Sequence, residues 1–209
     1  MLYLYHRETR TKVLGPGERY VIWVQGCKKR CPGCINPEGR LEGQNGYWIS
    51  TEKILAELKN EQGLMGITVS GGEPFLQAHG LAELVKSIKE NTQLDIMLYS
   101  GYTLAELSAK HDKDINFVLE HSDILVDGEY IEELNNNTIY RGSDNQEIHF
   151  LSPRYRDFKD IIYNTHNRDL EFISRNGELF MIGIPEKGFE AKFKRAILER
   201  TNFFKEEEK

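Results

Sequence analysis

Short apolar segments alternate with helical patterns of hydrophobic residues through the first two thirds of the chain. Runs of β-branched and aromatic residues predict strands at residues 20–25, 67–70, 94–99 and 124–126. Between these segments the hydrophobic positions recur at helical spacing, for example at Ile54 and Leu58. Strands that alternate with helices predict parallel strands joined by right-handed crossovers, so we expect an α/β fold.

Helix limits can also be predicted from the sequence. Ser50 is a predicted N-cap of the first helix. Hydrophobic positions at helical spacing predict the second helix over residues 81–88. Thr103 and Glu106 form a capping-box pattern at the start of the third. A further short helix is expected near residues 115–119.

The pattern changes near residue 150. Asn176 and Gly177 lie between apolar segments at residues 171–173 and 178–182, which is a strong signal for a β-hairpin. A helix is expected over residues 189–198, followed by a charged tail. The chain has no internal repeat.

The length of 209 residues corresponds to about one domain. We expect a core over residues 1–150 and a C-terminal extension, made of the hairpin and the helix, over residues 151–209. A closed eight-stranded βα barrel takes about 250 residues. An α/β barrel of this length is therefore expected to be incomplete.

Composition narrows the possible classes of protein. The chain is 39% hydrophobic and 29% charged, with a net charge of -6, so a surface that coats nucleic acid is not expected. No apolar run approaches the roughly 18 residues of a membrane span. The N-terminal segment lacks the apolar stretch of a secretory signal. We therefore expect a cytoplasmic protein.

All three cysteines lie in one short segment, at Cys27, Cys31 and Cys34, directly after the first predicted strand. An odd number of cysteines in a cytoplasmic chain argues against a disulfide framework. Crowded thiols instead indicate a metal or cluster site. An iron–sulfur cubane is normally held by four cysteines. Three would leave one iron open to a small molecule that brings its own donor atoms.

A structural zinc site is the alternative, but it needs a fourth cysteine or histidine ligand. The six histidines are scattered, and none has a familiar zinc spacing from the cysteines. The basic residues Lys28, Lys29 and Arg30 lie between the first two cysteines. We expect their charge to lower the pKa of the neighbouring thiols.

Each predicted strand runs into a segment that could take part in chemistry. In α/β folds the functional residues gather at the carboxyl ends of the parallel strands. We therefore expect four segments to meet at one rim: the cysteine loop, Gly71-Gly72-Glu73-Pro74, Ser100-Gly101 and Asp127-Gly128. This position makes Ser100 and Asp127, with Tyr99 and Glu129, candidates for lining a ligand site.

The Cys27-x3-Cys31-x2-Cys34 motif, followed by Gly-Gly-Glu-Pro at residues 71–74, resembles the radical S-adenosylmethionine enzymes. Within that superfamily the chain most resembles the activating proteins of anaerobic (class III) ribonucleotide reductases. The supporting segments come in the family's order and span about residues 13–150: residues 15–19, 31–36, 99–102, 127–128 and 140–146.

The resemblance implies an incomplete βα barrel of parallel strands that holds a [4Fe-4S] cluster on the three cysteines. S-adenosylmethionine would chelate the open iron through its amine and carboxylate. Gly33 and Ile35, beside Cys34, would approach this cofactor, and Gly71, Gly72 and Glu73 would lie near its methionine ammonium. The rim residues Tyr99, Ser100, Asp127 and Glu129 are candidates for lining its adenosine site.

The resemblance also implies the reaction. Reductive cleavage of S-adenosylmethionine gives a 5′-deoxyadenosyl radical, which takes a hydrogen atom from a glycine of the large reductase subunit. No acid or base side chain is required, and a flavodoxin-like electron donor is expected. Two alternatives stay open: a radical enzyme that modifies another peptide, protein or small molecule, and a non-catalytic zinc-binding module.

Overall fold

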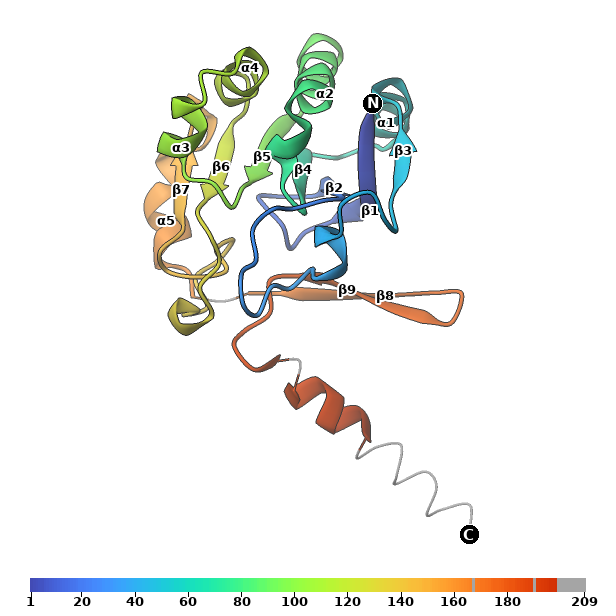
Figure 1. The fold of residues 1–209 in the computed structure, drawn as a ribbon, viewed down its shortest axis with the longest axis vertical. Helices are drawn as coiled ribbons and strands as arrows, with labels where there is room; N and C mark the ends of the chain where they lie inside the picture. Colours follow the sequence, from blue (N-terminus) through green and yellow to red (C-terminus); the bar gives the residue numbers. More distant parts are fainter. Residues whose placement is uncertain (167, 190, 199–209) are drawn as a thin grey trace.

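A mixed sheet of seven strands lies at the centre of the computed structural model, which describes residues 1–166, 168–189 and 191–198 (Figure 1). The strand order is β3-β1-β2-β4-β5-β6-β7. The strands are β1 (Leu2–Thr11), β2 (Arg19–Val24), β3 (Tyr47–Ile49), β4 (Gly66–Gly71), β5 (Asp95–Tyr99), β6 (Ile124–Asp127) and β7 (Glu147–Phe150).

The four predicted strands are confirmed as β2, β4, β5 and β6, and they pair in parallel. Strands β1, β3 and β7 were not predicted, and they add to the two sides of this unit in antiparallel pairings. The sheet is open rather than closed on itself, which confirms the α/β class and fits an incomplete barrel.

The helices are α1 (Thr51–Asn60), α2 (Ala78–Asn91), α3 (Leu104–Ala109), α4 (Lys113–Glu120) and α5 (Lys159–Asn164). Helices α1 and α3 begin at the predicted caps, α2 begins three residues before its predicted range, and α5 was not predicted. The Ser50 side chain accepts a hydrogen bond from the Lys53 amide, and Thr103 and Glu106 form the predicted capping box. No helix in the described part of the chain combines the length and the apolar character needed to cross a membrane.

Helices α1, α2 and α4 cover one face of the sheet (Figure 1). Because side chains alternate along a strand, Tyr20, Ile22 and Val24 point to this face. They pack there against apolar side chains of α2 such as Leu81 and Leu84. All five are fully buried.

The C-terminal part of the chain covers the opposite face. The turn η4 (Pro153–Phe158) and α5 contribute Tyr155 and Ile162 to a cluster with Met97 and Val126. This arrangement places residues 153–164 against the sheet. The division of the chain at residue 150 stays a prediction.

The predicted hairpin is confirmed as β8 (Leu170–Arg175) and β9 (Glu178–Gly183). Its Ile182 packs with Leu14 and Val21 on the same face of the sheet. A short helix over residues 191–198 follows, as predicted, and extends away from the body of the protein (Figure 1). The charged residues 206–208 lie outside the described residues.

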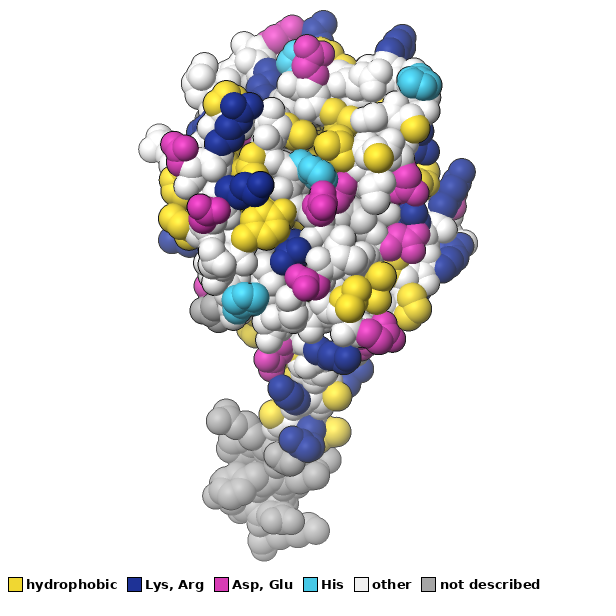
Figure 2. Space-filling view, turned by 90° about the vertical axis from the view of Figure 1, so that its left-hand side faces the viewer, with side chains coloured by type: hydrophobic (Ala, Val, Ile, Leu, Met, Phe, Trp, Pro, Cys, Tyr) yellow, Lys and Arg dark blue, Asp and Glu magenta, His cyan; other side chains and the backbone are white. Residues whose placement is uncertain are grey.

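The surface on the side of α3, α4 and α5 is mixed in character. Lys and Arg side chains are interspersed there with Asp and Glu side chains and with small hydrophobic groups (Figure 2). Phe158 in η4 and Ile161 in α5 are large hydrophobic side chains that are exposed in this segment.

Candidate functional site

The segments that follow the four parallel strands meet at one rim, as predicted. The amides of Gly72 and Glu73 donate hydrogen bonds to the carbonyls of Val24 (2.7 Å) and Gly26 (2.8 Å), which joins the β4 loop to the β2 loop. The Ser100 amide donates to the Val126 carbonyl at 2.9 Å, which joins the ends of β5 and β6.

The cysteine loop follows β2 and is held by backbone hydrogen bonds. The Gly26 amide donates to the Gly39 carbonyl at 2.8 Å, so the loop returns on itself around the turn η1 (Glu38–Arg40). All three thiols are free, with Cys27 buried and Cys31 and Cys34 half-buried. Three soft thiolate donors in one loop suit an iron–sulfur cluster.

The thiols do not converge on a single point. Within the described ranges, no three histidine, cysteine, aspartate or glutamate side chains are placed to hold one metal ion together. A cubane presents its irons at separate corners, so it takes thiolates that stay apart. Three free thiols in one loop are a donor set that such a cluster can use.

The expected effect of the neighbouring basic residues on the thiols is wrong. Burial raises the pKa of the Cys27 thiol to about 11, and burial also raises the pKa of Cys31. Lys28 and Arg30 are exposed to solvent, and Lys29 forms an ion pair with Glu129. Thiolate formation is therefore coupled to iron binding, because the metal stabilises the charge that burial disfavours.

Gly72 lies where two turns of the cysteine loop approach the end of β4. A Cβ atom at Gly72 would lie 2.1 Å from the Gly26 carbonyl oxygen and 2.7 Å from that of Gly39. At Gly71 a Cβ atom would lie 2.2 Å from the Val24 nitrogen. Only glycine permits this close approach, so the two glycines hold the β4 loop against the cysteine loop.

The Glu73 carboxylate joins the β4 loop to the β5 loop. It accepts hydrogen bonds from the Phe75 amide (3.0 Å), the Ser100 hydroxyl (3.0 Å) and the Gly101 amide (2.8 Å). The side chain is buried, and this burial raises its pKa although the three donors oppose the shift. Its predicted contact with the methionine ammonium stays a prediction.

Lys29 is a site residue whose structural role the sequence analysis missed. Its Nζ lies 2.6 Å from Glu129 Oε1 and 4.6 Å from the centre of the Tyr102 ring. One side chain of the cysteine loop thus contacts the loops after β5 and β6. No local spacing signals these partners, because folding alone brings them near.

The remaining predicted cofactor residues lie at or near the rim. Asp127 accepts hydrogen bonds from the amides of Leu104 and Glu147, and its Oδ2 lies 2.9 Å from His149 Nε2. Gly33 and Ile35 lie beside Cys34 and are exposed. The contacts of Gly33, Ile35, Ser100 and Asp127 with a cofactor stay predictions.

Tyr99 differs from these residues. Its hydroxyl is buried and has no hydrogen-bond partner among the described residues. The side chain packs with Tyr140 on the face of the sheet away from α2. A buried unpaired hydroxyl is costly, so Tyr99 offers a hydrogen-bonding group to a ligand on that face.

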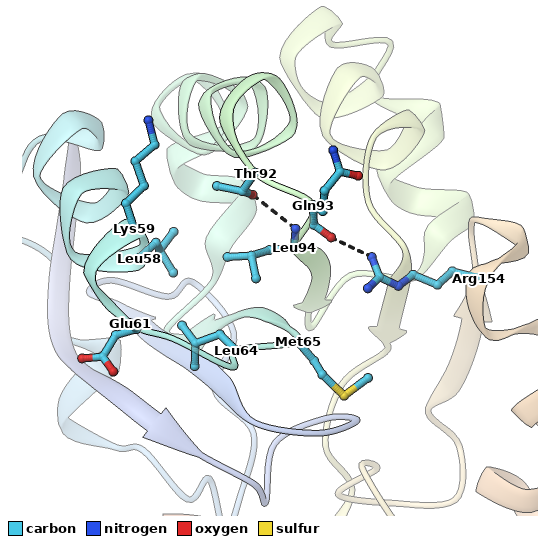
Figure 3. A pocket seen from close by; sticks show the side chains of 9 residues that line it. All are labelled: Leu58, Lys59, Glu61, Leu64, Met65, Thr92, Gln93, Leu94 and Arg154. Carbon is cyan, nitrogen blue, oxygen red and sulfur yellow. Dashed lines mark hydrogen bonds between the residues drawn. The ribbon is translucent and has the colours of Figure 1, made fainter.

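A groove at the amino ends of the strands contains none of the predicted residues. It is lined by apolar side chains such as Leu58, Leu64 and Leu94, and Arg154 closes one side with a 3.0 Å hydrogen bond to the Gln93 carbonyl (Figure 3). It lies at the opposite end of the strands from the thiols. The candidate site is therefore the rim and not this groove.

Comparison with known proteins identifies the family of this chain. Residues 13–149 match the family described as a 4Fe-4S single cluster domain. The chain is 39% identical over 144 residues to the anaerobic ribonucleoside-triphosphate reductase-activating protein of Vibrio cholerae, which covers 66% of this chain and 90% of that protein. The match to the family contains every predicted site residue.

Two further relatives carry the same name. The protein of Enterobacteria phage T4 is 31% identical over 141 residues, covering 65% of this chain and 86% of the relative. The protein of Escherichia coli K12 is 31% identical over 147 residues, covering 66% of this chain and 92% of the relative. The family match ends before η4, so the C-terminal extension lies outside it.

Proposed function

Since this chain belongs to the family of anaerobic ribonucleoside-triphosphate reductase-activating proteins, we propose that it activates an anaerobic ribonucleotide reductase by forming a glycyl radical on its large subunit. The observation that supports this proposal is the meeting of the three-thiol loop with the Gly71-Gly72-Glu73 turn at one rim. The family match, described by a 4Fe-4S cluster, favours the cluster over the zinc alternative.

The residues of the rim have distinct tasks in this proposal. Cys27, Cys31 and Cys34 would hold three irons of a [4Fe-4S] cluster and would leave the fourth to S-adenosylmethionine. When bound and reduced, the cluster would supply one electron for cleavage of S-adenosylmethionine into methionine and the radical that takes a hydrogen atom from the substrate. The protein positions the reactants and excludes water, and no side-chain acid or base is needed.

Residues on two sides of the thiols are proposed to contact S-adenosylmethionine. Gly33 and Ile35 lie next to Cys34, and Gly72 brings backbone groups close to the cysteine loop. Ser100 and Asp127 lie at the ends of β5 and β6. The unpaired Tyr99 hydroxyl can hydrogen-bond to a bound ligand from the face of the sheet opposite α2.

The proposal extends to cellular context. We propose a cytoplasmic location, where a reductase partner would be found, and a flavodoxin-like protein as electron donor. Residues 1–150 would form the catalytic core and residues 151–209 an added extension.

The test uses cluster-loaded protein prepared without oxygen. With a chemical reductant and S-adenosylmethionine it should release 5′-deoxyadenosine. When the large subunit of an anaerobic ribonucleotide reductase is added, electron paramagnetic resonance should show a glycyl radical. Cys31→Ala should abolish both signals, while a remote variant, Lys113→Ala on α4, should keep them.

The outcomes separate the alternatives. Release of 5′-deoxyadenosine without a glycyl radical would identify a radical enzyme with another peptide, protein or small-molecule substrate. Failure to cleave S-adenosylmethionine with a fully loaded cluster would refute the proposed chemistry.

A further inference from the structure

The loop between β6 and β7, residues 128–146, lies directly against the cysteine loop. A Cβ atom at Gly33, between Cys31 and Cys34, would lie 2.8 Å from the Glu132 carboxylate and 3.3 Å from the Tyr130 ring of this loop. Its Glu129 carboxylate lies 2.6 Å from Lys29 Nζ. Solvent exposure helps to set the reduction potential of an iron–sulfur cluster. The position of this loop therefore bears on the electronic properties of the cluster.

Side-chain hydrogen bonds within this loop connect its two ends, so the position of one end constrains the position of the other. The Gln146 side chain donates to the Gly128 carbonyl at 2.7 Å and accepts from the Gly142 amide at 2.7 Å. The Asn145 side chain donates to the Glu129 carbonyl at 2.8 Å. These bonds connect the segment around residue 142 to the residues that contact the cysteine loop.

Arg168, from the C-terminal extension, holds the far side of this loop. Its guanidinium donates to the carbonyls of Thr138 (3.0 Å), Arg141 (2.5 Å) and Gly142 (3.3 Å), and to that of Pro185 (3.0 Å). The planar, five-donor geometry of arginine suits several acceptors at once. The first three carbonyls belong to the loop, and the fourth belongs to the segment after β9.

We propose that Arg168 is a positioning residue for the cluster, which fixes the 128–146 loop against the cysteine loop and so limits the access of water to the cluster. The extension therefore acts on the cluster through a chain of contacts and does not touch it. Arg168 lies beyond the family match, which ends at residue 149. The inference rests on the cluster of the proposed function but does not depend on the identity of the reductase.

The test compares Arg168→Ala with Arg175→Ala in the full-length, cluster-loaded protein. Arg175 is a matched control, since it lies in the same extension but pairs with Glu8 on β1. A loosened loop admits water, which stabilises the more negative, reduced cluster. In Arg168→Ala the midpoint potential should become less negative, and a chelator should remove the iron about 10-fold faster.

Two results would overturn the proposal: an unchanged potential and chelation rate in folded Arg168→Ala, or equal changes in Arg175→Ala. If Arg168→Ala does not fold, Arg168→Lys keeps the charge but cannot serve the same set of carbonyls. It should shift both measurements in the same direction by a smaller amount, and no shift would equally refute the role. Neither measurement requires a reductase, so failure here is distinguishable from failure of the proposed activity.

Discussion

The two ends of the parallel strands use polar groups in opposite ways. At the amino ends, Arg19 and Asp95 are fully buried and paired at 2.5 Å, and the Tyr155 hydroxyl donates to the second Asp95 oxygen at 2.6 Å. At the carboxyl ends, Cys31 and Cys34 stay half-exposed and free. A fully satisfied buried network contributes to a unique fold, whereas groups left unsatisfied at the rim are available for a ligand.

The largest effect is expected for a substitution that affects only the site at the carboxyl ends of the strands. Cys31→Ala removes one of only three thiolates, so we expect complete loss of a stable cluster. The free energy of unfolding of the cluster-free protein should change little, because this thiol is half-exposed. Iron content after anaerobic reconstitution and urea denaturation measure the two effects. A cluster that survived the substitution would show that another side chain ligates it.

Asp95→Ala should have the opposite profile at the amino end. It leaves the buried Arg19 guanidinium without its carboxylate, which typically costs about 3–5 kcal/mol. Denaturation should show this loss in the cluster-free protein, while the folded fraction should still take up iron. A loss below about 1 kcal/mol would show that water or the Thr68 hydroxyl, which accepts from Arg19 at 2.7 Å, compensates for the missing charge.

The parallel strands were predictable because their cores are continuous runs of β-branched and aromatic residues. Strand β1 was not, since its sequence alternates Leu2 and Leu4 with tyrosines and then continues through His6 and Arg7. These polar residues are accommodated because this part of β1 pairs with β2 alone, beyond the residues that pair with β3, and meets the hairpin. The ring of Phe180 in β9 stacks on His6 at 5.3 Å.

The site was predictable to the extent that its residues are contiguous. The three cysteines and the Gly-Gly-Glu-Pro turn carry their signal in local spacing. The contacts of Lys29, Tyr130 and Arg168 carry none, because each joins segments far apart in the chain. The thiol pKa prediction failed for a related reason. That prediction considered only the basic residues close to the cysteines in sequence. Burial has the largest effect on the pKa of Cys27, and burial is a property of the folded chain.

Tyr155→Phe sharpens the comparison, since Tyr155 belongs to the C-terminal extension but completes the network at the amino ends. Removing its hydroxyl takes one donor from the Asp95 carboxylate, and hydrogen bonds to charged groups contribute about 1.5–3 kcal/mol. Urea denaturation should show a loss in this range with no change in iron content. A loss of iron would indicate that the two ends of the strands are coupled.

The smallest effect is expected for Arg175→Ala. The Arg175 side chain is 51% exposed and lies 2.9 Å from the Glu8 carboxylate. The Glu8 side chain is only 5% exposed, but loss of the Arg175 side chain opens its carboxylate to water. We therefore expect a cost at the upper end of the roughly 0.2–1 kcal/mol of exposed ion pairs, which weakens as salt is added. The hairpin should stay in place, because Ile182 packs with Leu14 and Val21 independently of this pair. Denaturation at low and high salt measures both effects. A salt-independent loss of unfolding free energy well above 1 kcal/mol would show that Arg175 holds the hairpin on the sheet by packing. The hairpin would then depend on its contact with β1 more than on the apolar contacts of Ile182.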